Sequence, residues 1–193
     1  MYLSVERAFR EAFATKMRDC RLHPLISKEQ IASIVSGLAS RISGDYGQKE
    51  LVLVCVLKGA FMFLSDLVRH LQMPVQLDFV RLASYGSGMK SSGRIEITKD
   101  IEVSVEGKDV IIVEDIIDSG RTIKFLKERL ALSKPRTVKV CTLLDKKARR
   151  EVEMEADYVG KEVDDVFIVG YGIDFNEAYR NLPQIYYVTT TDR

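Results

Sequence analysis

The sequence of 193 residues lacks several features that would point to particular classes of protein. Its three cysteines are an odd number, without the paired spacing of a zinc site or a disulfide framework. Charge of one sign is also missing, because 29 Lys and Arg residues oppose 28 Asp and Glu residues and leave a net charge of +1. This balance gives no electrostatic reason to expect nucleic acid or a membrane as the main partner.

Long apolar segments are absent as well. The longest unbroken apolar run, residues 51–57, is far too short to cross a bilayer. The N-terminus carries charged residues where a signal peptide has its apolar core. With 46% hydrophobic and 30% charged residues, the chain has the composition of an ordinary globular protein. We therefore expect a single domain over residues 1–193, located in the cytoplasm.

Apolar periodicity divides the chain into helices and strands. Residues 1–20 carry one apolar stripe, which predicts an N-terminal helical extension of unknown role. A capping box at Ser27-Lys-Glu-Gln30 predicts a second helix that continues to Gly44. Strands and helices then alternate: strands are expected at 51–57, 75–80, 110–113, 137–144, 166–169 and 185–189, and helices at 60–71 and 121–132.

This alternation predicts an α/β fold with a parallel sheet, in which ligands bind beyond the carboxyl ends of the strands. Residues 94–98 and 102–105 alternate apolar and polar side chains, which predicts that they pair as an antiparallel hairpin flap. The glycine-rich segment 84–93 before them is a candidate for a moving loop or a plain flexible linker.

The most informative segment is 110–122, Val-Ile-Ile-Val-Glu-Asp-Ile-Ile-Asp-Ser-Gly-Arg-Thr. A buried β-branched strand leads into adjacent carboxylates, Glu114 and Asp115, and then into a small-residue turn that opens a helix. Free backbone N–H groups at such a turn bind phosphate, while paired carboxylates favour a cation or hydroxyl groups. The pattern therefore predicts a site for a metal-chelated, phosphorylated sugar. It is not an ATP-binding Walker loop, because the glycine and lysine of that motif are missing.

This segment resembles the diphosphate-sugar signature of the type I phosphoribosyltransferases, most of all the branch that acts on 6-oxopurines. The resemblance covers roughly residues 22–190 and includes the other motifs in the same order. It implies a parallel-sheet core flanked by helices, with a small hood and a flap that closes as a lid. It also implies transfer of the 5-phosphoribosyl group from phosphoribosyl diphosphate to N9 of hypoxanthine, and of guanine, with Mg²⁺ as cofactor. The products would be IMP or GMP and pyrophosphate, and a homodimer or homotetramer is expected.

The resemblance also implies roles for single residues. Asp118 would be the catalytic proton acceptor facing N7 of the base. Contacts to phosphoribosyl diphosphate would come from Lys58, Gly59, Glu114, Asp115, Asp118, Ser119, Gly120, Arg121, Thr122 and Arg180. The purine would meet Lys146 at its O6 atom, Phe167 by stacking, the backbone of Ile168, and Asp174. The metal ligands would be Glu114, Asp115 and Asp174, and the lid would carry Ser84 and Tyr85.

Each of these residues also has an ordinary interpretation. Without the resemblance, Lys58 and Arg180 are exposed charges, Asp174 is a helix cap, and Phe167 is a core aromatic. The basic cluster 146–150 is a candidate anion site or a solvated loop. Two departures from relatives, Arg121 in place of lysine and Asp145 before the base lysine, leave affinity and base preference open.

Three alternatives remain open at this level: an enzyme of the family that prefers xanthine, one that acts on a pyrimidine, and a regulator that binds phosphoribosyl diphosphate and RNA, as pyrimidine attenuation proteins do. The regulator should have a basic surface and lack Asp118, Lys146 and Phe167 as a set. The net charge of +1 and the presence of all three residues argue against it.

Overall fold

The computed structural model describes residues 20–47, 49–85 and 94–190. The elements are β1 (Cys20–Ile26), α2 (Lys28–Tyr46), β2 (Leu51–Leu57), α3 (Phe61–His70), β3 (Gln76–Tyr85), β4 (Arg94–Lys99), β5 (Asp109–Ile117), α4 (Arg121–Ala131), β6 (Thr137–Asp145), the 3-10 helix η1 (Lys147–Arg149), β7 (Tyr158–Glu162), β8 (Ile168–Val169) and β9 (Ile185–Thr190). The predicted N-terminal helix lies outside the described residues, apart from Cys20, which begins β1.

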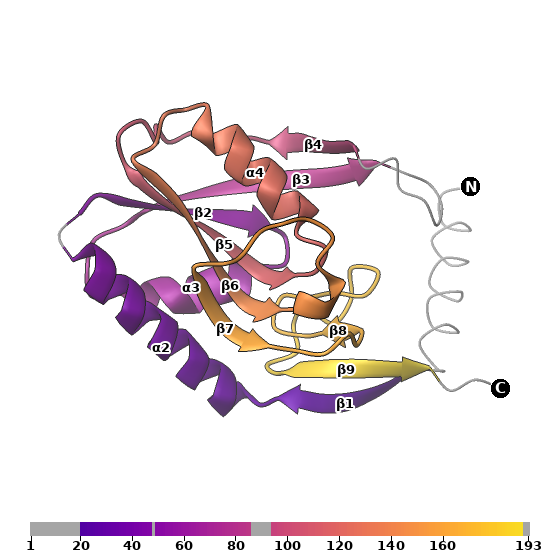
Figure 1. Cartoon of the computed structure of the whole chain (residues 1–193). Coiled ribbons are helices and arrows are strands. Elements are labelled where there is room, and N and C mark those ends of the chain that lie inside the picture. Colours follow the sequence, from indigo (N-terminus) through magenta and orange to yellow (C-terminus); the bar gives the residue numbers. More distant parts are fainter. Residues whose placement is uncertain (1–19, 48, 86–93, 191–193) are drawn as a thin grey trace, which may run out of the picture.

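Parallel pairing builds the larger of two sheets (Figure 1). Its strand order is β4-β3-β2-β5-β6-β7, with β4 antiparallel to β3 and all other neighbours parallel. The apolar runs of β2 and β5 are buried along almost their whole length, as expected for strands that are covered on both faces. The predicted α/β class with a mostly parallel sheet is therefore confirmed.

The strands alternate their side chains between two cores. Leu53 and Cys55 of β2 face α2 and α3, where they pack with residues such as Phe63. Val52 and Val54 face the opposite side, where Leu126 of α4 closes a second core. Because helices cover both faces, only the ends of the parallel strands are left for ligands. The cysteines Cys55 and Cys141 are both buried, and burial raises the pKa of the Cys55 thiol to about 12.

The capping box predicted at the start of α2 is present. The Ser27 hydroxyl accepts from the Gln30 backbone N–H at 3.3 Å, and the Gln30 side chain accepts from the Ser27 N–H at 2.9 Å. The helix continues past the predicted stop at Gly44 and ends at Gly47, whose φ of 53° suits a glycine after a helix. At Gly47 the backbone N–H donates to the Ser43 carbonyl at 3.0 Å.

Residues 94–99 form a hairpin with β3 and not with the segment that was predicted. β4 pairs antiparallel with β3, from Tyr85 opposite Arg94 to Arg81 opposite Lys99, and residues 102–105 form no strand, so the prediction of a 94–98/102–105 hairpin was wrong. The reason lies in Asp78, whose Oδ2 accepts the backbone N–H groups of Glu102 at 2.5 Å and of Val103 at 2.7 Å. Because these two N–H groups donate to a carboxylate, they are not available for hydrogen bonds to a neighbouring strand.

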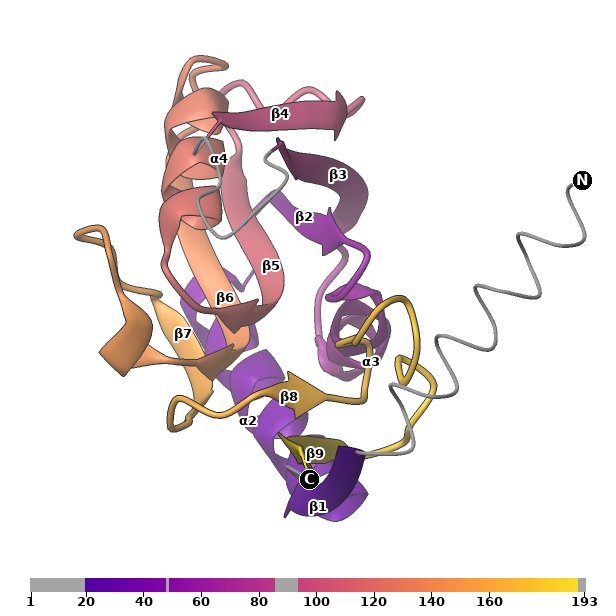
Figure 2. The ribbon, with the colours of Figure 1, turned by 90° about the vertical axis from the view of Figure 1, so that its right-hand side faces the viewer.

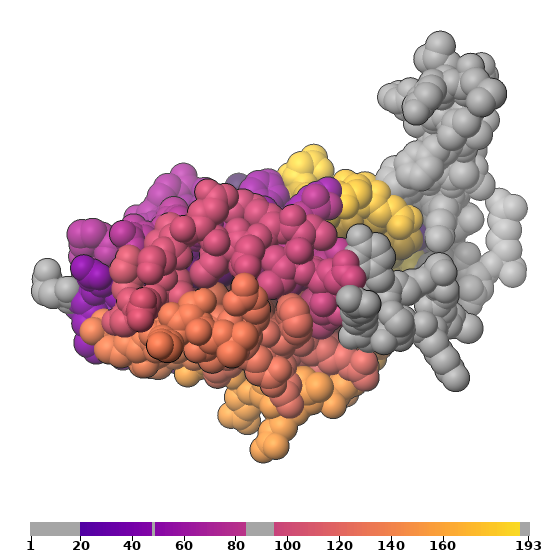
Figure 3. Space-filling view, turned by 90° about the horizontal axis from the view of Figure 1, so that it is seen from above, coloured from indigo at the N-terminus to yellow at the C-terminus, as the bar shows by residue number. Residues whose placement is uncertain are grey.

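A second, antiparallel sheet has the order β1-β9-β8. Its strand β8 lies beyond the tips of β5 and β6 in both ribbon views (Figures 1 and 2). This small sheet is the hood that the resemblance implied, and it places residues 166–190 against the carboxyl ends of the larger sheet. Seen from above, the pink chain around β4 covers the middle of the face turned to the viewer (Figure 3). Among the described residues, no helix is long and apolar enough to cross a membrane.

Candidate active site

The turn after β5 presents backbone N–H groups at the start of α4, and among them the Arg121 N–H makes a long hydrogen bond to Oγ of Ser119, at 3.4 Å. Gly120 has φ 81° and caps the start of α4 without a side-chain hydrogen bond. A Cβ atom there would lie 2.9 Å from Cδ of the long Arg150 side chain, so the positive φ is the main reason why this position needs a glycine. A hollow of about 140 Å³ opens at the turn; its lining residues are Glu114, Ile116, Ile117, Asp118, Ser119, Gly120, Thr122 and Ile123. The arrangement suits an anion at a helix N-terminus.

Two carboxylates lie buried just before this turn. Glu114 and Asp115 are each 8% exposed, at the carboxyl half of β5. Burial raises the pKa of Glu114 well above its usual value, and the neighbouring charge of Asp115 raises it further. Burial also raises the pKa of Asp115, against the opposing charge of Arg180. Such a pair is costly without a positive partner, so it favours a bound cation or hydroxyl groups.

The loop after β2 packs directly against these carboxylates. The peptide bond Leu57–Lys58 is cis, a feature that no residue pattern in the sequence could reveal. A Cβ atom on Gly59 would lie 1.8 Å from Oδ2 of Asp115, and one on Gly172 would lie 2.1 Å from the Gly59 carbonyl oxygen. Three segments distant in sequence, around residues 58, 115 and 172, therefore meet at one point.

Several charged groups surround that point. Nζ of Lys58 lies 2.9 Å from Oε2 of Glu177, and Nη2 of Arg180 lies 2.9 Å from Oδ1 of Asp174 and 3.4 Å from the same Glu177 oxygen. The hydrogen bond from Lys58 lowers the pKa of Glu177, and the charge of Arg180 lowers it further. Lys58 and Arg180, both predicted to contact diphosphate, thus converge on a single anionic atom.

The turn of residues 118–122, called the phosphate turn after its predicted role, is flanked by the residues predicted for the purine. Lys146 is 7% exposed, and its backbone N–H donates to the Ile117 carbonyl at 2.9 Å, so it sits beside the turn. Nε of Arg149 lies 3.0 Å from Oδ1 of Asp118, and its Nη1 lies 3.5 Å from Oδ2 of Asp165. This arginine links the phosphate turn to the chain just before Phe167.

Phe167 is half-exposed and meets Phe175 edge to face, with ring centroids 5.2 Å apart. A core aromatic would be buried, so the exposed ring is available to stack on a ligand. Ile168 follows it as a buried residue of β8. The carbonyl of Phe167 accepts from Val188 at 2.8 Å, which holds the segment on β9.

The two predicted lid residues are placed only through their backbone. Ser84 and Tyr85 end β3, opposite Ile95 and Arg94 of β4. Their side chains and residues 86–93 lie outside what the structure describes, so closure of a lid here stays a prediction.

The carboxylates of the site suit a magnesium ion. In the described ranges, no three His, Cys, Asp or Glu side chains gather into one cluster that could hold a metal by itself. Glu114 with Asp115, and Asp174 separately, therefore offer one or two carboxylates each. This fits Mg²⁺, which binds proteins through one or two carboxylates and completes its shell with water and substrate phosphate.

Sequence reasoning missed some of these partners. Arg149 and Arg150 were considered only as an anion site or a solvated loop, but they form ion pairs with Asp118 and Asp145 respectively. Arg150 also donates to the Asp118 carbonyl at 3.0 Å. The only signal for this in the sequence was the density of basic residues after a strand that ends in an acid.

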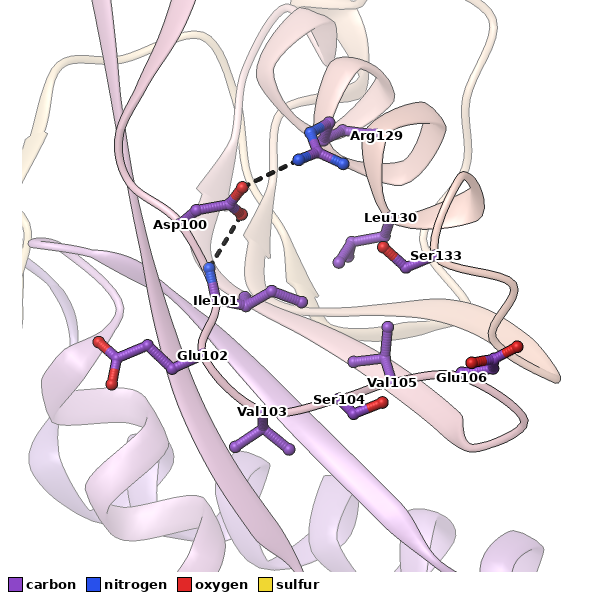
Figure 4. Close-up of a pocket in the computed structure, with 10 residues that line it drawn as sticks. All are labelled: Asp100, Ile101, Glu102, Val103, Ser104, Val105, Glu106, Arg129, Leu130 and Ser133. Carbon is purple, nitrogen blue, oxygen red and sulfur yellow. Dashed lines mark hydrogen bonds and ion pairs between the residues drawn. The ribbon is translucent and has the colours of Figure 1, made fainter.

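A larger hollow, of about 370 Å³, lies away from these residues (Figure 4). It runs between the segment 100–106 and the end of α4, where Arg129 pairs with Asp100 at 3.0 Å. None of the predicted site residues lines it. The converging loops, and not this hollow, therefore identify the candidate active site.

Comparisons with known proteins agree with this geometry. Residues 26–176 match the family model described as a phosphoribosyl transferase domain. The chain is 47% identical over 174 residues to the hypoxanthine-guanine phosphoribosyltransferase of Aquifex aeolicus, covering 90% of this chain and 98% of that one. It is 44% identical over 170 residues to the hypoxanthine phosphoribosyltransferase of Salmonella typhimurium, covering 87% and 96%.

Solved structures give the same result. A hypoxanthine phosphoribosyltransferase from Staphylococcus aureus has a TM-score of 0.84 at 42% identity, covering 90% of this chain and 94% of that one. A hypoxanthine-guanine phosphoribosyltransferase from Bacillus anthracis has a TM-score of 0.82 at 47% identity, covering 89% and 99%. The chain therefore belongs to the phosphoribosyltransferase family, among its hypoxanthine-guanine phosphoribosyltransferases.

Proposed function

We propose that this protein is a purine salvage enzyme that transfers the 5-phosphoribosyl group of phosphoribosyl diphosphate to N9 of hypoxanthine or guanine. One observation carries the proposal beyond the family assignment. A glycine turn at a helix N-terminus, two buried carboxylates and two cations from separate segments meet at the carboxyl ends of β2 and β5. The 5′-phosphate, the ribose hydroxyls and the diphosphate each have a matching group within this one site.

The phosphate of the sugar binds in the turn of residues 118–122. Gly120 allows close approach of the backbone, and the hydroxyls of Ser119 and Thr122 donate hydrogen bonds. Arg121 pairs with Glu151 at 2.7 Å and adds positive charge at the edge of the turn. The diphosphate lies across the loop of Lys58 and Gly59 and reaches Arg180.

Glu114, Asp115 and Asp174 are the residues that would hold Mg²⁺, which supplies electrostatic clamping of the diphosphate oxygens when it is bound. Glu114 and Asp115 also face the ribose hydroxyls. Because burial disfavours their charged forms, binding of a cation or of hydroxyl donors relieves the cost of the buried pair.

The purine binds between the phosphate turn and the hood. Phe167 stacks on the ring, the backbone of Ile168 contacts its far edge, and Lys146 donates to O6. In the transfer step, N9 forms a bond to C1 of the ribose while the bond from C1 to the diphosphate oxygen breaks, and pyrophosphate leaves with that electron pair. Asp118 takes the proton from N7, so the purine ends neutral. A 6-amino purine would present a donor to Lys146 and be rejected at a cost of about 1–3 kcal/mol.

We also infer a moving lid, a cellular location and an oligomeric state. The segment beginning at Ser84 and Tyr85 closes over the site, because water would otherwise capture the activated sugar. The enzyme works in the cytoplasm as a homodimer or homotetramer.

The test is pyrophosphate release from phosphoribosyl diphosphate with Mg²⁺ and each of hypoxanthine, guanine, xanthine, adenine and uracil. The proposal expects rapid release with hypoxanthine and guanine and little with adenine or uracil. A preference for xanthine or uracil would favour another enzyme of the family. No release with any base, together with binding of RNA, would favour the regulator.

A further inference from the structure

Glu177 occupies an unusual position in the candidate site. Its Oε2 atom is shared between Nζ of Lys58 at 2.9 Å and Nη2 of Arg180 at 3.4 Å. These two cations come from segments more than a hundred residues apart, and both face the proposed diphosphate position. A lone carboxylate oxygen between them stands where a diphosphate oxygen would have the same two partners.

We propose that Glu177 competes with the diphosphate for Lys58 and Arg180. Its carboxylate must leave these two cations before phosphoribosyl diphosphate or pyrophosphate can bind. This inference rests on the proposed function and deepens it, because it assigns an affinity-determining role to a residue outside the predicted site set. The competitor weakens binding of the diphosphate in the substrate and in the product alike.

The contacts of Arg180 support displacement of Glu177 by an incoming anion. Arg180 is held in place: its Nη1 donates to the Gly172 carbonyl at 2.8 Å, and Nη2 lies 2.9 Å from Asp174. Its Nε is buried and has no hydrogen-bond partner among the described residues, so the guanidinium keeps an unused donor. Glu177 satisfies only part of Arg180, and an incoming anion with several oxygens can satisfy more.

Glu177 is free to leave. Its side chain is 64% exposed, so it loses little packing when it moves into solvent. It lies at a turn that Phe175 and Ala178 close through paired backbone hydrogen bonds of 3.1 and 3.0 Å. Its backbone N–H donates to Oδ2 of Asp174 at 2.8 Å, and its φ of 65° lies in the left-handed region. The backbone is therefore fixed and the carboxylate is the movable part.

The expected effect is modest because both contacts are solvent-exposed ion pairs. Removing the carboxylate charge should tighten binding of pyrophosphate about three- to tenfold, the range for one or two such pairs. The KM for phosphoribosyl diphosphate should fall by a similar factor. The KM for hypoxanthine should not change, because the Glu177 carboxylate contacts Lys58 and Arg180, and the hydrogen bond to Asp174 comes from the backbone N–H, which the substitution keeps.

The experiment is calorimetric titration of the full chain with inorganic pyrophosphate in MgCl₂, for the wild type, Glu177→Gln and Glu128→Gln. Glu128 is exposed on α4, so its substitution makes the same change in net charge away from the site. Tighter binding by Glu177→Gln alone supports the proposal. Equal or weaker binding by Glu177→Gln, beside a wild type that binds, overturns it. A wild type that binds neither pyrophosphate nor phosphoribosyl diphosphate overturns the proposed function itself, and this inference with it.

Discussion

The α-carbon of Gly172 lies against the carbonyl oxygen of Gly59, with no room for a side chain between them. A Cβ atom on Gly172 would come within 2.1 Å of that oxygen, and its φ of 99° is a conformation that other residues rarely adopt. This contact joins the loop after β2 to the segment that carries Asp174. The geometry of both predicted diphosphate contacts therefore depends on one glycine.

We predict that Gly172→Ala destabilises the protein by about 1–3 kcal/mol, from backbone strain and overpacking, and raises the KM for phosphoribosyl diphosphate at least tenfold. Urea unfolding and steady-state kinetics measure the two effects. Gly37→Ala is the matched control: it lies in α2 with open space around its α-carbon and should stabilise the helix by up to about 1 kcal/mol. If both variants behaved alike, the close contact would have no functional role.

The second prediction concerns the proposed proton acceptor. Asp118→Asn should lower kcat about 10²- to 10⁴-fold, because an amide cannot take the N7 proton. Binding of phosphoribosyl diphosphate should survive, since the backbone of the turn is unchanged. Stopped-time assays and titration calorimetry separate the two quantities.

Asp165→Asn is the control for this variant, since Asp165 is the other carboxylate that Arg149 contacts, at 3.5 Å in an exposed pair. Its loss should change kcat less than twofold. Parallel loss of turnover and of sugar-diphosphate binding in Asp118→Asn would mean that Asp118 is structural only.

The third prediction concerns base selection. Lys146→Ala should lower kcat/KM for hypoxanthine about 10- to 100-fold, because the O6 acceptor loses its partner, a cost of about 1–3 kcal/mol. The KM for phosphoribosyl diphosphate should stay within a factor of two. The neighbouring Lys147→Ala removes an exposed lysine that pairs with Glu162, and it should leave both parameters unchanged. An equal loss in the two variants would remove Lys146 from the purine site.

The fourth prediction concerns stability and pH. Asp109, at the amino end of β5, is buried and accepts from Nε of Arg136 at 3.1 Å, from its Nη2 at 2.7 Å and from the Thr137 hydroxyl at 2.7 Å. The hydrogen bonds from Arg136 lower the pKa of Asp109 below its ordinary value despite burial. A lowered pKa in the folded state means stability that is present above the unfolded pKa of about 3.9 and is lost as pH falls through the folded pKa.

Asp109→Asn should therefore cost about 2 kcal/mol at pH 7, and the difference from the wild type should shrink below about pH 4. Urea unfolding across pH 3–7 checks this. Asp164→Asn, at an exposed position, should show no such dependence. A gap between wild type and Asp109→Asn that stayed constant down to pH 3 would contradict the assignment.

The site could be predicted from sequence to the extent that it lies in continuous motifs. Residues 110–122 combine a buried strand, two acids and a helix-opening turn, and each property depends on near neighbours in the chain. The capping box at Ser27 is local in the same sense. Such patterns survive folding because the backbone conformation that they favour is the one that the fold uses.

Pairings between distant residues were beyond the sequence. The strand β1 was missed because Pro24 interrupts the short alternation of residues 20–23, and because its partner β9, where Tyr186 lies opposite Pro24, is far away in the sequence. β4 pairs with β3 and not with residues 102–105, because Asp78 accepts the hydrogen bonds of backbone N–H groups in that segment. The contacts of Glu177 with Lys58, and of Arg149 with Asp118, likewise join segments that the chain order separates.

Composition, periodicity and short motifs thus determined the class of fold, the buried strands and the turn that opens α4 by themselves. Only the tertiary structure decided which strands neighbour each other, which glycines touch, and which cation meets which carboxylate. The physical reason is that burial and turn conformation are set by residues within a few positions of one another, while ion pairs and close backbone contacts depend on where the folded sheet brings remote loops together.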